Sequence, residues 1–176
     1  MSEMHTLKTE RLSMRWLKPG DESLLLAVWN DPAFMKNVGD RGVRTTEEAS
    51  EALGNGPLKL YAGYGYGPYR VALADGDEPI GICGLFKREN LDDPDIGFAL
   101  LPDHCGKGLA FEAAAAVATH ARDGLGLRRM TAIVSPQNIA SIGLIEKLGL
   151  HFERLLTMPG DDKEVCLFSI DWNRID

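Results

Sequence analysis

The sequence predicts a mixed α/β fold, in which strands and helices share one core. Short segments that alternate apolar and polar residues, as strands do, are interleaved with segments whose apolar residues recur at helical spacing. Residues 96–116 indicate a strand, a glycine turn and an alanine-rich helix in direct succession. The chain has 176 residues, 44% of them hydrophobic, which suits one domain, residues 1–176, with a sizeable core.

The first third of the chain predicts a strand followed by helices. Leu12, Met14 and Trp16 alternate along a strand at residues 7–16. Pro19 is a residue type that often opens a helix, and apolar positions continue from it to about residue 30. Further helices are expected at residues 32–38 and after Thr45 or Thr46, since Thr45 is followed three places on by Glu48, as in a capping box.

The rest of the chain alternates strands and helices after one irregular stretch. Residues 53–69 are rich in glycine and tyrosine and are expected to be the least regular part of the chain. Turns are expected at residues 75–77, 90–94 and 159–163, where glycine, proline and polar residues gather. Strands are expected at residues 69–74, 79–87, 95–101, 129–134, 152–157 and 165–170, and helices at 106–124 and 139–148.

The glycine turn at residues 106–110 is built to hold an anion. Backbone N–H groups at such a turn, and at the start of the helix that follows, can bind a phosphate. Gly106 and Gly108 accept backbone conformations that other residues resist, and Lys107 adds a cation. The dinucleotide fingerprint is broken by Phe111, and no Ser or Thr follows the lysine as a P-loop requires. A glycine turn without a ligand is the alternative.

Asn138 begins a second candidate feature. It follows the strand at residues 129–134 and precedes an amphipathic segment that ends at Gly149. Asn is a favoured helix N-cap, and Gly is favoured just past a helix C-terminus. A residue in this position also lies at the mouth of a strand-to-helix crevice, so a cap, a ligand contact or both remain open.

Composition excludes several classes of protein. The net charge of −7 argues against a nucleic-acid binder, which usually carries a basic face. No run of about 18 apolar residues predicts a membrane span, and residues 1–10 lack the apolar centre of a signal peptide. Three cysteines without C-x-x-C spacing and four scattered histidines predict reduced thiols, a cytoplasmic location and no metal site.

Several motifs in the same order resemble the GNAT superfamily of N-acetyltransferases. The long segments are G-F-A-L-L-P-D-x-x-G-K-G-L-A-x-E-A at residues 97–113 and S-P-Q-N-x-A-S-I-x-L-I-E-K-L-G-L-H-F-E at residues 135–153. Shorter ones are T-E-R-L-S-M-R at residues 9–15, W-N-D-P at 29–32 and I-G-I-C-G-L at 80–85. The likeness spans about residues 9–169 and is strongest to the branch typified by the ribosomal-protein acetyltransferases RimJ and RimL.

The resemblance implies a fold, a co-substrate and site residues. The fold is a mostly antiparallel central sheet flanked by helices, and the co-substrate is acetyl-CoA. The implied acceptor is an amine, either a protein N-terminus or a small molecule, and a homodimer is compatible. Ser141 would protonate the leaving thiolate, and Asn138 would contact the co-substrate. Backbone groups of the strand end and the glycine loop would bind the pantetheine arm and the diphosphate: Leu100, Leu101, Cys105, Gly106, Lys107, Gly108, Leu109 and Ala110.

Two positions depart from the family pattern. Cys105 replaces the Gln or Arg that usually opens the phosphate loop, and His104-Cys105 stands where an aromatic residue and Trp are usual. Cys105 as an acyl-carrying nucleophile would need a lowered pKa. For the carbonyl, we expect polarisation by N–H groups around Leu100 and Leu101.

The general base is left open by the sequence. The acidic candidates either form a mouth to the cleft or belong to a solvated turn: Glu89, Asp92, Asp93 and Asp95. Glu153 and His104 are further candidates, and a water-relayed proton path without an essential base is the alternative. The tyrosines of residues 54–69 either border the acceptor cleft on a mobile segment or cap the core.

Two functions other than acetyl transfer remain. One is a CoA-binding regulatory module without transfer activity, against which the presence of both Asn138 and Ser141 argues. The other is an interaction protein on the same fold without a ligand, against which the complete loop at residues 106–110 argues.

Overall fold

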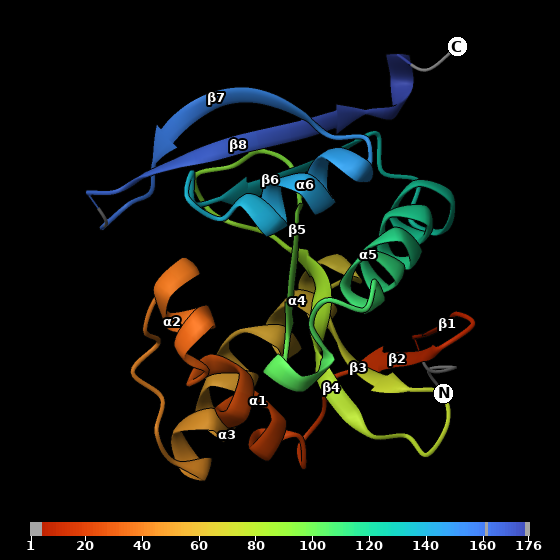
Figure 1. Ribbon diagram of the computed structural model, residues 1–176, viewed down its shortest axis with the longest axis vertical. Helices are drawn as coiled ribbons and strands as arrows, with labels where there is room; N and C mark the ends of the chain where they lie inside the picture. The colour runs from red at the N-terminus through yellow and green to blue at the C-terminus, as the bar shows by residue number, and fades with distance from the viewer. Residues whose placement is uncertain (1–4, 161, 175–176) are drawn as a thin grey trace.

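An open sheet of eight strands forms the frame of the computed structural model, which describes residues 5–160 and 162–174 (Figure 1). Residues 1–4 of the amino-terminal segment and Asp161 of the expected turn lie outside the described residues. The strand order is β1-β2-β3-β4-β5-β6-β8-β7. The strands are β1 (Thr6–Lys8), β2 (Leu12–Trp16), β3 (Pro68–Leu73), β4 (Pro79–Phe86), β5 (Asp95–Leu100), β6 (Arg129–Val134), β7 (His151–Thr157) and β8 (Glu164–Asp171).

Neighbouring strands run antiparallel except at the centre, as expected. There β5 and β6 run parallel and pair at Asp95 and Thr131. Beyond this point the two strands diverge, which Figure 1 shows as the separation between the vertical β5 and the more horizontal β6. A parallel pair that splays in this way leaves one edge of β5 without a neighbouring strand, so backbone groups there can meet a ligand.

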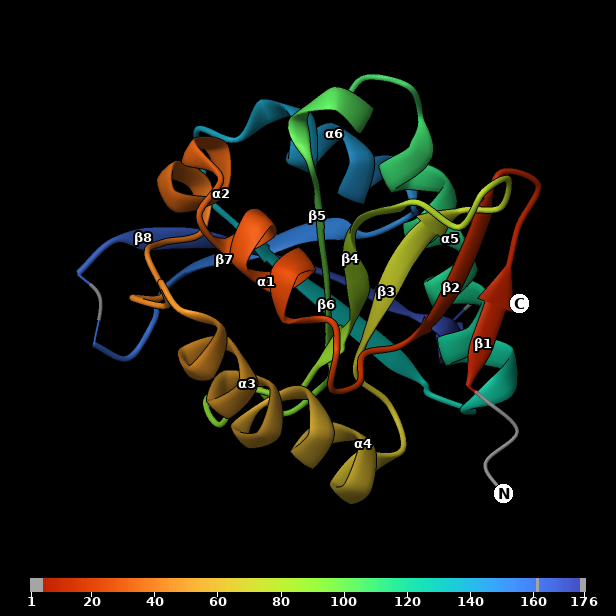
Figure 2. The same cartoon turned by 90° about the horizontal axis from the view of Figure 1, so that it is seen from below.

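Helices cover both faces of the sheet. Figure 2 shows α1, α3 and α4 on one side of β3 and β4, and α5 on the other. Apolar side chains of α5 and α6 share one core with the sheet, whereas α1, α2 and α3 form a second core around Leu25 and Trp29. The helices are α1 (Glu22–Trp29), α2 (Pro32–Asn37), α3 (Thr46–Asn55), α4 (Pro57–Tyr64), α5 (Leu109–Thr119) and α6 (Ile139–Lys147).

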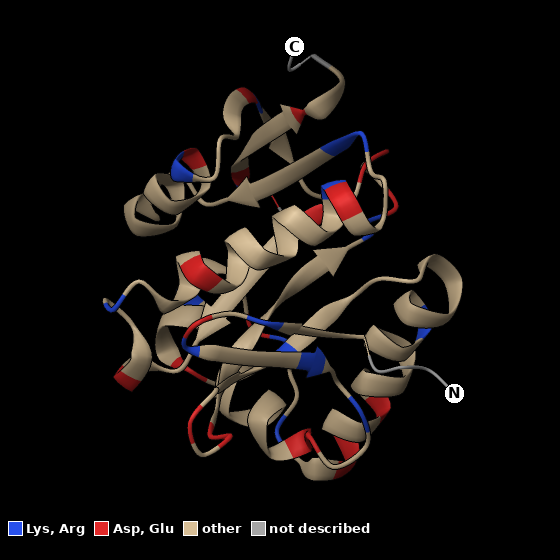
Figure 3. Ribbon diagram, turned by 90° about the vertical axis from the view of Figure 1, so that its right-hand side faces the viewer, with Lys and Arg blue, Asp and Glu red and all other residues tan. Residues whose placement is uncertain are grey.

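Helix α5 packs closely on the sheet because its residues are small. Ala113, Ala114 and Val117 are buried against the sheet. Between Glu112 and Arg122 the chain carries no charged residue, and Figure 3 shows this uncharged middle of the helix. The helix passes into a π-helical turn at His120–Gly124. In the described part of the chain, no helix is both long and apolar enough to cross a membrane.

Two expected elements were wrong. Residues 7–16 form a hairpin rather than one strand: the Thr9 N–H donates to the Leu12 carbonyl (3.0 Å), and the Thr9 hydroxyl accepts from the Leu12 N–H (3.1 Å). Residues 53–69 are mostly helical, since they hold the end of α3 and all of α4. Pro57 opens α4, and Gly65, with φ of +75°, ends it.

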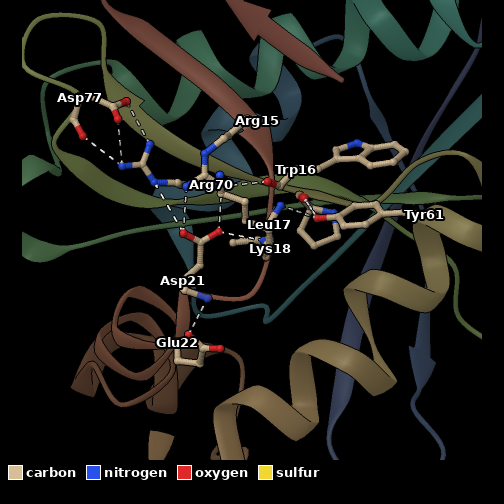
Figure 4. A network of polar contacts seen from close by, with 11 residues as sticks. Arg15, Trp16, Leu17, Lys18, Asp21, Glu22, Tyr61, Arg70 and Asp77 are labelled. Carbon is tan, nitrogen blue, oxygen red and sulfur yellow. Dashed lines mark hydrogen bonds and ion pairs between the residues drawn. The ribbon is translucent and has the colours of Figure 1, made fainter. Parts of the chain in front are cut away.

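Helix α1 begins after Asp21, which belongs to an ion-pair network, rather than at Pro19. Asp21 accepts hydrogen bonds from Arg15 Nη1 (2.8 Å), Arg15 Nη2 (3.0 Å) and the Lys18 N–H (2.9 Å). Arg70 Nε lies 4.0 Å from the same carboxylate, and Arg70 also bonds Asp77 (Figure 4). The network joins β2 and β3 to Asp21, the residue that precedes the first turn of α1.

Removing this carboxylate should destabilise the fold. Asp21→Ala removes both carboxylate hydrogen bonds of Arg15, whose side chain is only 24% exposed, and leaves the buried Arg70 with Asp77 as its acidic neighbour. We expect a loss of about 3–5 kcal/mol in the free energy of unfolding, measured by urea denaturation. Asp40→Ala breaks an exposed pair with Arg44 and should change stability little. An Asp21→Ala protein as stable as Asp40→Ala would contradict this assignment.

The same carboxylate predicts a pH dependence. Burial alone would raise the pKa of Asp21, but hydrogen bonds from Arg15 and Lys18 outweigh it and lower that pKa below its ordinary 3.8. A lowered folded-state pKa contributes stability that is present above 3.8 and is lost as the pH falls through the folded value. Acidification through this range should therefore narrow the difference in stability between the wild type and Asp21→Ala.

Candidate functional site

A cavity of about 400 Å³ lies where β5 and β6 diverge, between α2, α5 and α6. We call it the central cavity. Seven of the ten predicted site residues line it: Leu100, Cys105, Gly106, Gly108, Ala110, Asn138 and Ser141. The remaining lining comes mainly from α1, α2 and β5 and from the exposed side of α6, and includes Val28, Asp31, Phe34, Asn37, Phe98, His104, Phe111 and Lys147. Residues far apart in sequence thus meet at the gap in the sheet.

The glycine loop has the backbone geometry that was expected. Gly106 and Gly108 adopt φ of +78° and +79°, in the left-handed region that favours glycine. Gly108 is the N-cap of α5 and offers no side chain to the first N–H groups of the helix. A Cβ on Gly106 would meet no atom within 4 Å, so the loop borders open space. Backbone N–H groups beside such a space can bind an anion.

The three predicted residues outside the cavity lining have other roles in the structure. The Leu109 side chain is buried and anchors the start of α5 in the core. The Lys107 carbonyl accepts a hydrogen bond from Arg11 Nη1 (3.0 Å), and its side chain is exposed. The Leu101 N–H donates to the Ile80 carbonyl of β4 (2.8 Å), so it is not available to polarise a thioester carbonyl.

The neighbouring amide of Leu100 is better placed. Leu101 directs its N–H to β4, and the N–H groups of successive strand residues point to opposite edges. The N–H of Leu100 therefore faces the edge from which β6 has diverged. Of the two backbone N–H groups expected to polarise the carbonyl, only that of Leu100 is free of the bond to β4.

Asn138 is confirmed as the N-cap of α6. Its Oδ1 accepts a hydrogen bond from the Ser141 N–H (3.3 Å). Both residues also line the central cavity, and Ser141 is half-buried there. The cap therefore fixes the first turn of α6 with its polar groups at the cavity wall.

The acidic candidates for a general base lie outside this cavity. Asp93 and Glu153 both accept hydrogen bonds from Arg129, at 2.9 Å and 2.5 Å. Asp95 is 1% exposed and pairs with Arg88; burial raises the pKa of Asp95, and Arg88 opposes that rise. Glu89 and Asp92 are exposed in the turn before β5 and do not line the cavity either.

The titratable groups at the cavity wall do not include an activated nucleophile. Burial, and to a smaller extent the charge of Asp31, raise the pKa of the Cys105 thiol, which disfavours the thiolate. The Nε2 atom of His104 lies 3.9 Å from Oε1 of Glu78, a residue of the turn between β3 and β4. The Asp31 carboxylate accepts from the Phe34 N–H (3.3 Å) and caps α2. Asp31 is a cavity residue that the sequence does not predict, although it belongs to the W-N-D-P motif at residues 29–32.

The tyrosine-rich segment does not form a mobile loop. Tyr61, Tyr66 and Tyr69 are buried, and Tyr64 is exposed at the end of α4. The Tyr61 hydroxyl accepts from the Leu17 N–H (2.8 Å) and donates to the Pro68 carbonyl, which ties α4 to the sheet. None of the four tyrosines lines the central cavity as described. The core-capping alternative therefore holds for the three buried tyrosines.

One cluster beside the phosphate loop was missed by the sequence reasoning. Arg11 and Thr9 of the first hairpin bond Glu112 of α5, and Arg11 also reaches the loop. Lys147 Nζ lies 4.1 Å from the ring centroid of Phe111. The motif at residues 9–15 contains Thr9 and Arg11, but nothing in it indicates a contact with α5. That contact follows from the way the first hairpin packs against the helix.

Comparison with known proteins identifies a family for this chain. The model of the acetyltransferase (GNAT) domain family matches residues 11–151. The uncharacterized N-acetyltransferase p20 of Bacillus licheniformis is 31% identical over 158 residues, which cover 87% of this chain and 86% of p20.

Two solved structures share the fold. The ribosomal-protein alpha-N acetyltransferase RimL, in complex with coenzyme A, has a TM-score of 0.80 at 19% identity, covering 95% of this chain and 98% of RimL. The spermidine N-acetyltransferase of Vibrio cholerae, in complex with CoA and spermine, has a TM-score of 0.77 at 19% identity, covering 94% and 98%. With the family match over residues 11–151, the chain belongs to the GNAT acetyltransferases, enzymes that use acetyl-CoA as the acetyl donor.

Proposed function

We propose that this enzyme transfers the acetyl group of acetyl-CoA to a primary amine by direct attack while both substrates are bound. The observation that carries the proposal is the gathering of seven predicted site residues around one cavity at the gap between β5 and β6. Acetyl-CoA supplies a thioester whose carbonyl carbon accepts the amine. Holding two reactants in one site supplies much of the rate without a covalent enzyme intermediate.

The chain holds the donor mainly through its backbone. N–H groups of the loop from Gly106 to Ala110 bind the diphosphate at the start of α5. The free edge of β5 pairs with the pantetheine arm, and the N–H of Leu100 polarises the thioester carbonyl. Asn138 contacts the donor from the opposite wall of the cavity. Backbone donors explain why the replacement of the usual Gln or Arg by Cys105 is compatible with the site.

The reaction releases one proton from the attacking amine and delivers one to the departing thiolate of CoA. The amine nitrogen forms a bond to the carbonyl carbon, and the carbon–sulfur bond breaks. Ser141 donates its hydroxyl proton to the departing thiolate and regains one through water, while the amine releases its extra proton to water. All the acidic candidates for a general base lie outside the cavity, and this supports a path in which water takes the proton. Asp31 is the one carboxylate among the described lining residues, and its side chain is engaged in capping α2.

The acceptor is either a protein N-terminus or a small amine. RimL is named for a protein acceptor and the Vibrio cholerae enzyme for spermidine, so the shared fold supports both classes. We place the acceptor beside α1 and α2, where Val28 and Phe34 line the cavity together with the carboxylate-bearing Asp31. We propose neither a nucleic acid nor a membrane as a partner.

The test combines donor binding with turnover. CoA at one hundred times its dissociation constant should stabilise the protein by about 2.7 kcal/mol, which is measured as a rise in Tm. Acetyl-CoA consumption is then followed with a panel of peptide N-termini, polyamines and other small amines. Turnover with any amine supports the proposal. A rise in Tm without turnover across the panel favours a CoA-binding regulatory module, and no rise in Tm overturns both.

A further inference from the structure

The first hairpin, β1 and β2 with their turn, is hydrogen-bonded to the Glu112 carboxylate of helix α5. The backbone N–H of Arg11 donates to Glu112 Oε2 (2.9 Å), and the side-chain Nε of Arg11 donates to Glu112 Oε1 (2.8 Å). The Thr9 hydroxyl donates to Glu112 Oε2 as well. The Glu112 side chain is 20% exposed, and these hydrogen bonds fix its carboxylate in the first turn of α5. The Arg11 guanidinium is thereby held in one orientation.

The same guanidinium reaches the phosphate loop. Arg11 Nη1 donates to the Lys107 carbonyl (3.0 Å), and Arg11 Nη2 would lie 3.5 Å from a Cβ built on Gly108. Lys107 and Gly108 share a planar trans peptide, in which the C=O and N–H bonds point in opposite directions. A carbonyl held toward Arg11 therefore turns the Gly108 N–H away from the hairpin. Gly108 lines the central cavity on its other side.

The effect of this cluster is one of orientation rather than of net charge. Burial alone would raise the pKa of Glu112, but hydrogen bonds from Thr9 and Arg11 outweigh it and lower that pKa. Glu112 is therefore ionised at neutral pH and balances the charge of Arg11. A neutral pair attracts a diphosphate weakly, whereas a fixed peptide presents its N–H in the required direction at no further cost in entropy.

We propose that Arg11 is a positioning residue for the acetyl donor: held by Glu112, it fixes the Lys107–Gly108 peptide so that the Gly108 N–H meets the diphosphate. The inference rests on the proposed function, because it assumes that this loop binds acetyl-CoA. Arg11 itself contacts neither the reacting atoms nor the acceptor. Its loss should therefore weaken donor binding through the diphosphate and leave the chemical step unchanged.

The test compares two donors, acetyl-CoA and S-acetylpantetheine, which lacks the diphosphate. For Arg11→Met we expect the Kd of CoA and the KM of acetyl-CoA to rise about tenfold. The kcat and the KM of S-acetylpantetheine should stay at wild-type values. Arg122→Met is the matched control, since Arg122 pairs with Asp123 at the far end of the same helix. This control should behave as the wild type with both donors.

Arg11→Lys is the second variant and covers the case in which Arg11→Met does not fold. It keeps the charge but lacks the planar fork that bonds Glu112 and Lys107 together. A several-fold loss of CoA affinity in Arg11→Lys supports positioning, whereas wild-type affinity in a folded variant overturns it. An equal rise in KM for both donors would show a general distortion and also overturns the inference. A wild type that does not bind CoA refutes the proposed function itself, which separates the two failures.

Discussion

A Gly108→Val protein should bind CoA at least about tenfold more weakly than the wild type, a loss of about 1.4 kcal/mol or more. Gly108 has φ of +79°, a conformation that a β-branched residue resists strongly. The Cβ of the new side chain would lie 3.5 Å from Arg11 Nη2, so the two methyl groups of Val would crowd the guanidinium that bonds the Lys107 carbonyl. Both effects move the N–H groups that we assign to the diphosphate. Titration calorimetry with CoA measures the loss.

The control for this substitution is Gly126→Val. Gly126 has φ of +67°, and a Cβ there would meet no atom within 4 Å, so the backbone strain is similar and the steric cost is small. It lies in the connection before β6 and does not line the central cavity. Both variants should lose stability, but only Gly108→Val should lose CoA affinity. Equal CoA affinity in the two folded variants would refute the assignment of the phosphate loop.

Local patterns predicted most of the elements because each one carries its own signal. The alanine-rich segment after the glycine loop forms α5, and the Thr45 side chain caps α3 by accepting from the Glu48 N–H. The errors fall where such a signal is missing or misleads. The turn of the first hairpin, residues 9–11, contains neither glycine nor proline. Helices α3 and α4 contain Gly54 and Gly63, and the many glycines and tyrosines of residues 53–69 suggested irregular structure.

The site was predicted in the parts that are contiguous in sequence. The loop that holds Gly106 and Gly108 and the start of α6 are local strand-to-helix motifs, so their residues could be named in advance. The Arg11–Glu112 contact joins positions 101 residues apart, and it depends on how the first hairpin packs against α5. Asp31 reaches the cavity through the packing of α1 and α2. Neither arrangement is encoded in a local pattern, because the sheet topology decides it.

Ser141→Ala should slow acetyl transfer by about 10²–10⁴-fold while acetyl-CoA still binds. The Ser141 backbone N–H is bonded to the Asn138 cap, and Ala keeps this contact, so α6 should retain its start. What is lost is the hydroxyl at the cavity wall. If that hydroxyl only contacted the bound donor, its removal would cost about 1 kcal/mol of binding, or about fivefold in affinity. A loss of kcat with a nearly unchanged Kd for CoA therefore identifies a proton donor.

Ser135→Ala separates this role from a general effect on α6. Ser135 precedes the same helix, and its hydroxyl donates to Gln137 Oε1 (2.8 Å) rather than lining the central cavity. Its loss should leave kcat near the wild-type value. A thiolate with a good proton donor nearby leaves faster than one that waits for water, so the ratio of the wild-type kcat to the Ser141→Ala kcat should fall as the pH is lowered. If Ser141→Ala turns over like Ser135→Ala at every pH, water protonates the thiolate and Ser141 serves only in the first turn of α6.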